Sequence, residues 1–178
     1  MEGGKNKLLA LLKNKDFFLG LVLGLAVIVI ISLVFWIVFS VFNKQPSTSS
    51  TFRVNNNSEI CQEDGKPVVY LFSTSNCSHC LWIKDTFDKI VRRYVASGKI
   101  KAYHYDLDSG DDLLTSETEK LVPKEAFAVF NEFNPGGGVP TFVFGCKYYR
   151  IGNGYEQNSD LNAEANEFEI ILNKLINK

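Results

Sequence analysis

The feature that most constrains this chain is a stretch of 26 residues, from Phe17 to Phe42, that contains no charged side chain. Most of these residues are Leu, Val, Ile or Phe, so a helix formed by them would have no polar face to turn toward water. At about 1.5 Å per residue the helix would be roughly 39 Å long, whereas the hydrocarbon core of a bilayer is about 30 Å thick. The sequence therefore predicts a transmembrane helix over residues 17–42, in contact with membrane lipid.

Two other interpretations of this stretch compete with a retained anchor. A cleaved signal peptide usually has an apolar core of about 7–15 residues and a small-x-small cleavage site. Val38-Phe39-Ser40 fits such a site weakly. The other interpretation is a helix buried in a soluble core, although such a helix normally carries some polar residues along one side.

The flanks of the apolar stretch predict its orientation. The short leader over residues 1–16 carries four lysines, Lys5, Lys7, Lys13 and Lys15. On the other side only Lys44 and Arg53 lie nearby. Because basic residues favour the cytoplasmic side, we expect a single-pass protein of the cell membrane with a cytoplasmic N-terminus and residues 43–178 outside the cytoplasm.

The remaining residues predict a short linker and one mildly acidic domain. Residues 43–59 are rich in Ser, Thr and Asn, which is typical of a flexible linker, and residues 60–178 have the length of one compact domain. Residues 43–178 carry 15 of the 19 basic and 18 of the 20 acidic side chains, a net charge of 15 − 18 = −3. The clustered positive charge of a nucleic-acid-binding protein is missing, so no nucleic-acid partner is expected.

The hydrophobic periodicity of residues 60–178 predicts elements in the order β-α-β-α-β-β-α. The continuous β-branched and aromatic run Pro67–Thr74 is typical of a buried strand. Apolar residues then recur every three or four positions from Ser78 to Ala96, which indicates an amphipathic helix that leads to a second strand over Lys99–Asp108. The remaining elements are a helix opened by Pro123, two short strands that turn near Gly145, and a helix over about 161–176.

The sequence Cys77-Ser78-His79-Cys80 lies where the first strand meets the first helix. A thiol at a helix N-terminus faces unpaired N–H groups and the positive end of the dipole, which stabilise its thiolate. Cys77 is expected to be the exposed nucleophile and Cys80 the buried resolving thiol, one turn further along. His79, with Ser78 inside the same loop, is expected to tune the pKa of the Cys77 thiol. A structural disulfide or half of a zinc site are the alternatives.

A strand is followed by Cys-x-x-Cys, a helix, a strand and a helix, and then by Gly138-Val139-Pro140-Thr141-Phe142 and a final helix. The order of these elements and motifs resembles the thioredoxin family. The resemblance implies an α/β, three-layer domain, with a mixed sheet between flanking helices, behind the one N-terminal transmembrane helix. It also implies that Pro140 is cis and faces the Cys pair, where it presents the backbone of Val139 to an extended substrate strand. A proline that simply turns the chain into a strand is the alternative.

Several residues near the motif differ from the family pattern. His79 before the second Cys is similar to protein disulfide isomerases and periplasmic disulfide-forming enzymes, whereas thioredoxins usually have Gly-Pro between the cysteines. Leu71 stands where thioredoxins have a buried acid, and Asn76 stands where a Trp commonly precedes the motif. The polar residues 43–67 leave little room for the usual first strand and helix, so a trimmed core is expected.

The resemblance also places the two remaining cysteines, Cys61 and Cys146. In a thioredoxin-like sheet the strand before the Cys pair runs antiparallel to the strand after the cis proline, which brings the two residues near each other. We expect a structural disulfide between them. Two free buried thiols or a second redox pair are the alternatives.

Two other sets of residues are interpreted as structural. His104 lies within a predicted strand and is read as an ordinary sheet residue. Phe127, Phe130 and Phe133 recur at helical spacing and are read as core residues rather than a ligand-binding site.

These observations predict a membrane-tethered, extracytoplasmic thiol–disulfide oxidoreductase that exchanges dithiols and disulfides on protein substrates. It would need no cofactor beyond the Cys77–Cys80 disulfide and no metal, and a membrane redox partner is a further candidate partner. The rival hypotheses are a redox-inert peptide-binding module of the same fold and, less favoured, a metal-binding protein that uses its cysteines.

Overall fold

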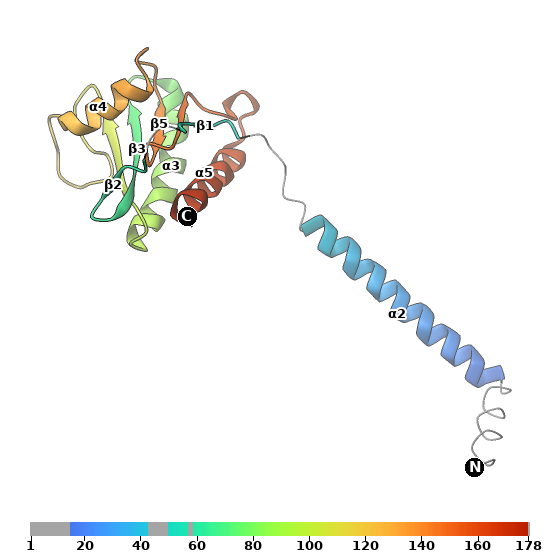
Figure 1. Ribbon diagram of the computed structural model, residues 1–178. Helices are drawn as coiled ribbons and strands as arrows, with labels where there is room; N and C mark the ends of the chain where they lie inside the picture. Colours follow the sequence, from blue (N-terminus) through green and yellow to red (C-terminus); the bar gives the residue numbers. More distant parts are fainter. Residues whose placement is uncertain (1–14, 43–49, 57–58, 178) are drawn as a thin grey trace. The chain divides into compact units, whose positions relative to one another are not determined.

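The computed structural model describes residues 15–42, 50–56 and 59–177, and the chain divides into two units, residues 1–48 and 49–178 (Figure 1). Most of the predicted leader over residues 1–16, and residues 43–49 and 57–58 of the predicted linker, lie outside the described residues.

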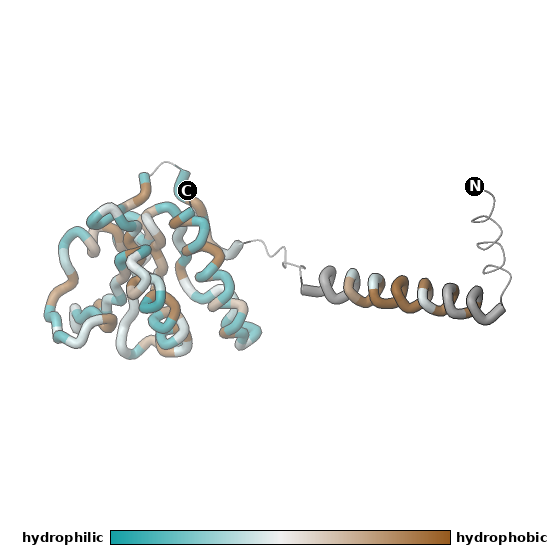
Figure 2. Tube along the Cα trace, turned by 90° about the horizontal axis from the view of Figure 1, so that it is seen from below, coloured by the Kyte–Doolittle hydropathy of each residue, from teal (hydrophilic) through white to brown (hydrophobic). Residues whose placement is uncertain are grey.

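The first unit contains the helix α2 (Lys15–Phe42). The side chains described in it, Leu19 and those of residues 22–36, are exposed and mostly apolar (Figure 2). Among the helices that the structure describes, none is long and apolar enough to cross a membrane. The predicted transmembrane helix over residues 17–42 extends beyond these described side chains at both ends.

The second unit is built on a mixed sheet whose central strand is β3 (Lys66–Ser73). β3 pairs in parallel with β4 (Lys101–Asp106) and antiparallel with β5 (Thr141–Phe144), which pairs antiparallel with β6 (Tyr148–Ile151). Two short strands complete the order, β1 (Arg53–Val54) beside β6 and β2 (Gln62–Glu63) beside β3. The parallel step between β3 and β4 is made by the long helix that connects them, as the periodicity predicts.

Helices cover both faces of this sheet (Figure 1). α3 (Ser78–Ala96) and α5 (Leu161–Ile176) pack on one face, where they bury the larger core cluster with Leu71, Phe87 and Phe142. α4 (Lys124–Phe133) packs on the other face, over a second cluster that contains Phe72 and Phe130. A single 3-10 turn, η1 (Glu156–Asn158), lies between β6 and α5. The predicted mixed α/β architecture is therefore confirmed.

The structure differs from the sequence-based interpretation at residues 50–56, which were assigned to the flexible linker. Phe52 is buried between Phe142, Phe144 and Phe168, and Arg53–Val54 form the edge strand β1. One aromatic side chain in a polar segment gives no periodicity, so its burial is decided by the space that the sheet leaves open. A second difference concerns Phe127, which was interpreted as a core residue. Phe127 is 46% exposed, whereas Phe130 and Phe133 are buried as expected.

Candidate functional site

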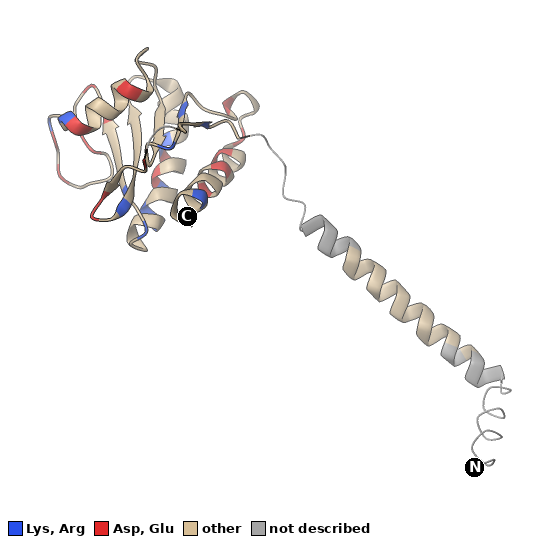
Figure 3. Cartoon of the chain, in the orientation of Figure 1, with Lys and Arg blue, Asp and Glu red and all other residues tan. Residues whose placement is uncertain are grey.

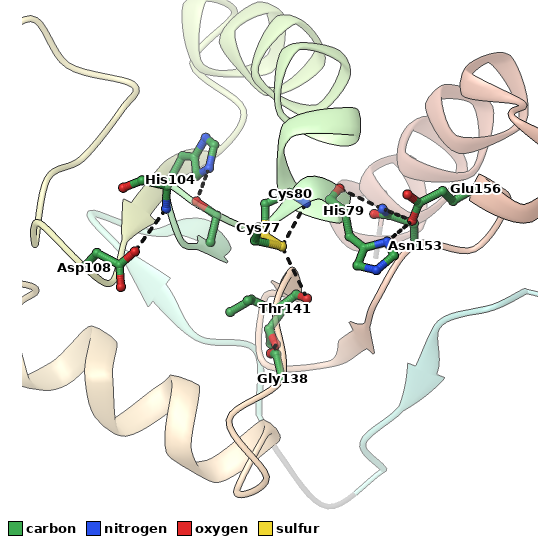
Figure 4. Close-up of a disulfide and its surroundings, with 12 residues drawn as sticks. Cys77, His79, Cys80, His104, Asp108, Gly138, Thr141, Asn153 and Glu156 are labelled. Carbon is green, nitrogen blue, oxygen red and sulfur yellow. Dashed lines mark hydrogen bonds and ion pairs between the residues drawn. A yellow bond between two sulfur atoms is a disulfide. The ribbon is translucent and has the colours of Figure 1, made fainter.

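The Cys77–Cys80 pair lies at the N-terminus of α3 and forms a disulfide, with Cα atoms 5.2 Å apart (Figure 4). Cys77 is the N-cap residue, and its extended backbone lets its carbonyl accept the first helical hydrogen bond, from the N–H of Leu81. The N–H of Cys80 donates to the sulfur of Cys77 over 3.1 Å. Cys77 is partly exposed, whereas Cys80 is 2% exposed. The arrangement gives one sulfur that a partner can reach and one that it cannot.

The same geometry favours negative charge on the sulfur of Cys77 after reduction. Its sulfur accepts a hydrogen bond from the N–H of Cys80, which has no carbonyl partner within the helix. This bond lies at the positive end of a 19-residue helix. Such a position lowers the pKa of a thiol, and the thiolate is the nucleophile in disulfide exchange.

The peptide bond between Val139 and Pro140 is cis, and the carbonyl oxygen of Val139 lies 3.8 Å from the sulfur of Cys77. This loop is held from behind by the buried side chain of Asn134. Its amide nitrogen donates to the carbonyl oxygen of Gly138 at 2.5 Å and to the hydroxyl of Thr141 at 2.7 Å. The backbone beside the Cys77 sulfur is thereby fixed in place.

His79 points away from the sulfur, toward the segment that follows β6 (Figure 4). Its Nδ1 lies 2.8 Å from Oε2 of Glu156, and the amide nitrogen of Asn153 donates both to the carbonyl oxygen of His79 and to Glu156. Partial burial opposes ionisation of Glu156. The hydrogen bonds from Asn153 and His79, together with the charge of His79, outweigh it and lower the pKa of the Glu156 carboxyl. Ser78 is exposed beside it.

The opposite side of the Cys loop is fixed by two aspartates at the end of β4. The hydroxyl of Ser75 donates to Asp106 at 2.7 Å, and the N–H of Ser75 donates to Asp108 at 3.2 Å. The loop before Cys77 is therefore held by β4, while the residues between the two cysteines are held by the segment after β6.

A family model described as thioredoxin matches residues 56–170, which is more than half of the chain and includes Cys77, Cys80 and Pro140. The chain belongs to the thioredoxin family. Among curated proteins no match is found.

Solved structures also resemble this thioredoxin-family chain. The oxidoreductase NmDsbA1 from N. meningitidis aligns with a TM-score of 0.47 and 14% identity, over 72% of this chain and 93% of that one. A protein from Agrobacterium tumefaciens aligns with a TM-score of 0.34 and 17% identity, over 60% of this chain and 45% of that one. Both similarities are weak, so the family assignment rests on the family model.

Cys61 and Cys146 also form a disulfide in this thioredoxin-family domain, with Cα atoms 5.4 Å apart. Cys61 precedes β2, and Cys146 lies in the turn between β5 and β6 with φ of +53°. The N–H of Cys61 donates to the carbonyl oxygen of Gly145, next to the bridge. The bridge belongs to the cluster on the α4 side of the sheet and lies at the opposite ends of β3 and β5 from Cys77 and Pro140.

The sequence-based interpretation missed Asn153, Glu156 and Asn134, which position the loops of the site. Their signal in the sequence is weak, because polar residues in turns are common and usually solvated. Within the part of the chain that the structure describes, no group of three or more His, Cys, Asp or Glu side chains could hold a metal ion.

Proposed function

We propose that this chain is a thiol–disulfide oxidoreductase that acts on protein substrates and is tethered to the cell membrane with residues 43–178 outside the cytoplasm. The observation that carries the proposal is the pairing of a reachable Cys77 with a buried Cys80 at a helix N-terminus. The carbonyl of Val139 beside that sulfur supports an extended substrate backbone as the bound form.

Exchange would begin when a substrate thiolate attacks the sulfur of Cys77. The Cys77–Cys80 bond breaks, a mixed disulfide with Cys77 forms, and Cys80 leaves as a thiolate that takes up a proton. A second substrate thiolate then attacks the substrate sulfur of the mixed disulfide. The substrate leaves with a new disulfide, and its two electrons and two protons stay on Cys77 and Cys80. The reverse sequence reduces a substrate disulfide, with Cys80 attacking the sulfur of Cys77 to release the product.

Each round leaves the Cys pair in the opposite oxidation state, so a second partner must restore it. A membrane redox partner would suit this task, because the tether would keep both proteins in the same plane. The support for the tether is the uncharged stretch 17–42, and the support for its orientation is the four lysines in the leader.

One further observation agrees with a place outside the cytoplasm. The Cys61–Cys146 disulfide is of a kind that persists in oxidising compartments. Basic and acidic side chains are interspersed over the described residues of the second unit (Figure 3), and the proposal includes no nucleic-acid partner.

Trapping of substrates tests the function. In the Cys80→Ser variant no resolving thiol is present, so we expect protein substrates to accumulate as mixed disulfides on Cys77. These are visible as adducts on non-reducing gels that disappear with reductant. The matched control is Cys77→Ser, which keeps the other thiol but has no reachable nucleophile and should form none.

Insulin reduction and the oxidative refolding of a reduced disulfide protein provide the second measurement. Activity in either assay that is lost in Cys77→Ser supports the proposal. No adducts in Cys80→Ser and no Cys77-dependent activity in either assay would contradict it and favour a redox-inert peptide-binding module.

A further inference from the structure

The imidazole of His79 is held by a segment far away in the sequence. The Nδ1 atom of His79 lies 2.8 Å from Oε2 of Glu156. The amide nitrogen of Asn153 donates over 2.9 Å to the main-chain oxygen of His79 and over 2.9 Å to the Glu156 carboxylate (Figure 4). The three residues form a closed set of hydrogen bonds in which both the ring and the backbone of His79 are fixed. The His79 side chain is 63% exposed, so packing does not hold it.

The segment that carries Asn153 and Glu156 is itself fixed by hydrogen bonds to buried Glu164. The fully buried carboxylate of Glu164 accepts from the N–H groups of Gly154 and Tyr155, at 2.5 and 2.8 Å. Its other oxygen binds the buried guanidinium of Arg150. Gly154 has no room for a side chain, because a Cβ there would lie 2.5 Å from Nη1 of Arg150. The turn therefore presents Asn153 and Glu156 from a fixed backbone.

Asn153 keeps this arrangement at a cost. Its Oδ1 is buried and has no hydrogen-bond partner in the described part of the chain, and leaving a buried acceptor unsatisfied is unfavourable. A buried group of this kind calls for an explanation, which its amide nitrogen supplies by bridging His79 and Glu156.

We propose that Glu156 and Asn153 are positioning residues that hold the His79 imidazole away from the Cys77 sulfur and thereby set the balance between the disulfide and dithiol forms of the Cys pair. The inference rests on the redox function proposed above. It adds that residues outside the Cys-x-x-Cys loop influence the reduction potential of the Cys77–Cys80 pair.

The expected direction follows from charge. The reduced site carries a thiolate on Cys77, which a nearby carboxylate disfavours and a nearby imidazolium favours. Removing the negative charge of Glu156 and releasing the imidazole both stabilise the thiolate, and a more stable thiolate favours the dithiol form. Because the His79 side chain is largely exposed and Glu156 is only partly buried, solvent screens the pair, and we expect a modest effect of about two- to fivefold.

The test is Glu156→Gln in the full chain, compared with wild type in a pH titration of the Cys77 thiol and in a redox equilibrium at one fixed pH. We expect the acid dissociation constant of the Cys77 thiol, followed by thiolate absorbance and alkylation rate, to increase about two- to fivefold. The equilibrium constant for reduction of the Cys77–Cys80 disulfide should increase by a similar factor, about 10–20 mV for a two-electron couple at 29.6 mV per tenfold change.

Two variants separate positioning from loss of structure or of charge. Glu169→Gln removes a carboxylate from another exposed pair, with Arg93 between α5 and α3, and should leave both constants unchanged. Asn153→Ala keeps the Glu156 charge but removes the bridge, so it should shift both constants in the same direction by a smaller factor. The ¹⁵N signal of His79 Nδ1 should change in both site variants and not in Glu169→Gln.

The inference is overturned if Glu156→Gln leaves the two constants unchanged, moves them the other way, or shifts them no more than Glu169→Gln does. The proposed function has a separate test, because Cys80→Ser can trap substrates whatever the behaviour of Glu156. A protein that traps substrates but shows no effect of Glu156 retains the function and contradicts only the positioning role.

Discussion

At the scale of single residues, the core beneath the Cys loop contains polar groups whose partners are all within the fold. His104 is fully buried, with Nε2 2.9 Å from the Ser73 hydroxyl and Nδ1 2.7 Å from Asp88. The sequence predicts only a sheet residue at this position. Its partners come from β3 and α3, and they become neighbours only when the helix packs on the sheet.

Asp112 is a second buried polar residue of this region and allows a prediction about pH. Burial raises the pKa of the Asp112 carboxyl, against the hydrogen bonds that it accepts from the N–H groups of His104 and Leu114, and the charge of Glu119 raises it further. The folded state therefore binds the proton more tightly than the unfolded chain. Stability falls as pH rises from the ordinary aspartate value of about 3.9 and levels off above the folded value.

The measurement is the difference in unfolding free energy between wild type and Asp112→Asn, from urea titrations between pH 3.5 and 7. The difference isolates Asp112 and the change it makes in the pKa of its neighbour Glu119. We expect wild type to lose stability relative to the variant as pH rises through this range. A difference that stays constant, or that changes in the opposite sense, contradicts the assignment.

At the scale of elements, one buried arginine joins three parts of the domain. Arg150 on β6 binds Glu164 and Glu167 of α5 and the Thr51 hydroxyl of the segment before β1, and its guanidinium lies 4.7 Å from the centroid of the Phe52 ring. Glu167 also accepts from the N–H and hydroxyl of Thr51. This network attaches residues 50–54 to the domain through the guanidinium of Arg150. The same guanidinium binds Glu164, which fixes the turn that carries Asn153 and Glu156.

Arg150→Ala leaves two buried carboxylates without their cation. Removing one partner of a buried ion pair costs about 3–5 kcal/mol, and we expect a loss of unfolding free energy in this range, measured by urea titration. Arg93→Ala, which breaks the exposed pair with Glu169, is the matched control and should lose no more than about 1 kcal/mol. Equal losses in the two variants would contradict the role given to the buried network.

Sequence patterns predicted the elements better than they predicted this network. The strands β3 and β5 are mostly apolar runs, and α3 has apolar residues at helical spacing. Their burial can therefore be predicted from each segment of the sequence alone. Arg150, Glu164 and Glu167 are charged, and charged side chains are mostly exposed in proteins. Their burial depends on one another, and the pairing joins residues from different elements that no local period relates.

At the scale of the whole molecule, the sequence could predict which residues meet at the candidate site because they combine a motif with its place in the fold. Cys77 and Cys80 stand at a strand–helix junction, and Pro140 follows a glycine-rich turn before a strand. The turn that holds His79 was not predictable in the same way. Asn153 and Glu156 reach the site only through the path of the chain after β6.

The Cys61–Cys146 disulfide joins the start of the folded domain to the β5–β6 turn, across a sequence separation of 85 residues. Closing a loop of this length lowers the entropy of the unfolded chain, an effect of about 4–5 kcal/mol in the chain-entropy model. The double variant Cys61→Ser/Cys146→Ser should therefore lose stability of that order in urea titrations under oxidising conditions. Its Cys77–Cys80 pair should still exchange disulfides below the unfolding transition, because this second bridge lies at the opposite ends of β3 and β5 from Cys77 and Pro140.

Reductant provides the control for that comparison. Wild type titrated with both disulfides reduced should approach the stability of the double variant, whereas the double variant should change little, since the Cys77–Cys80 bridge closes a loop of only a few residues. If removing Cys61 and Cys146 changes the unfolding free energy by less than about 1 kcal/mol, the bridge is not a main support of the fold. If it abolishes exchange by a folded domain, the pair belongs to the redox chemistry instead, as a second dithiol that passes electrons to Cys77 and Cys80.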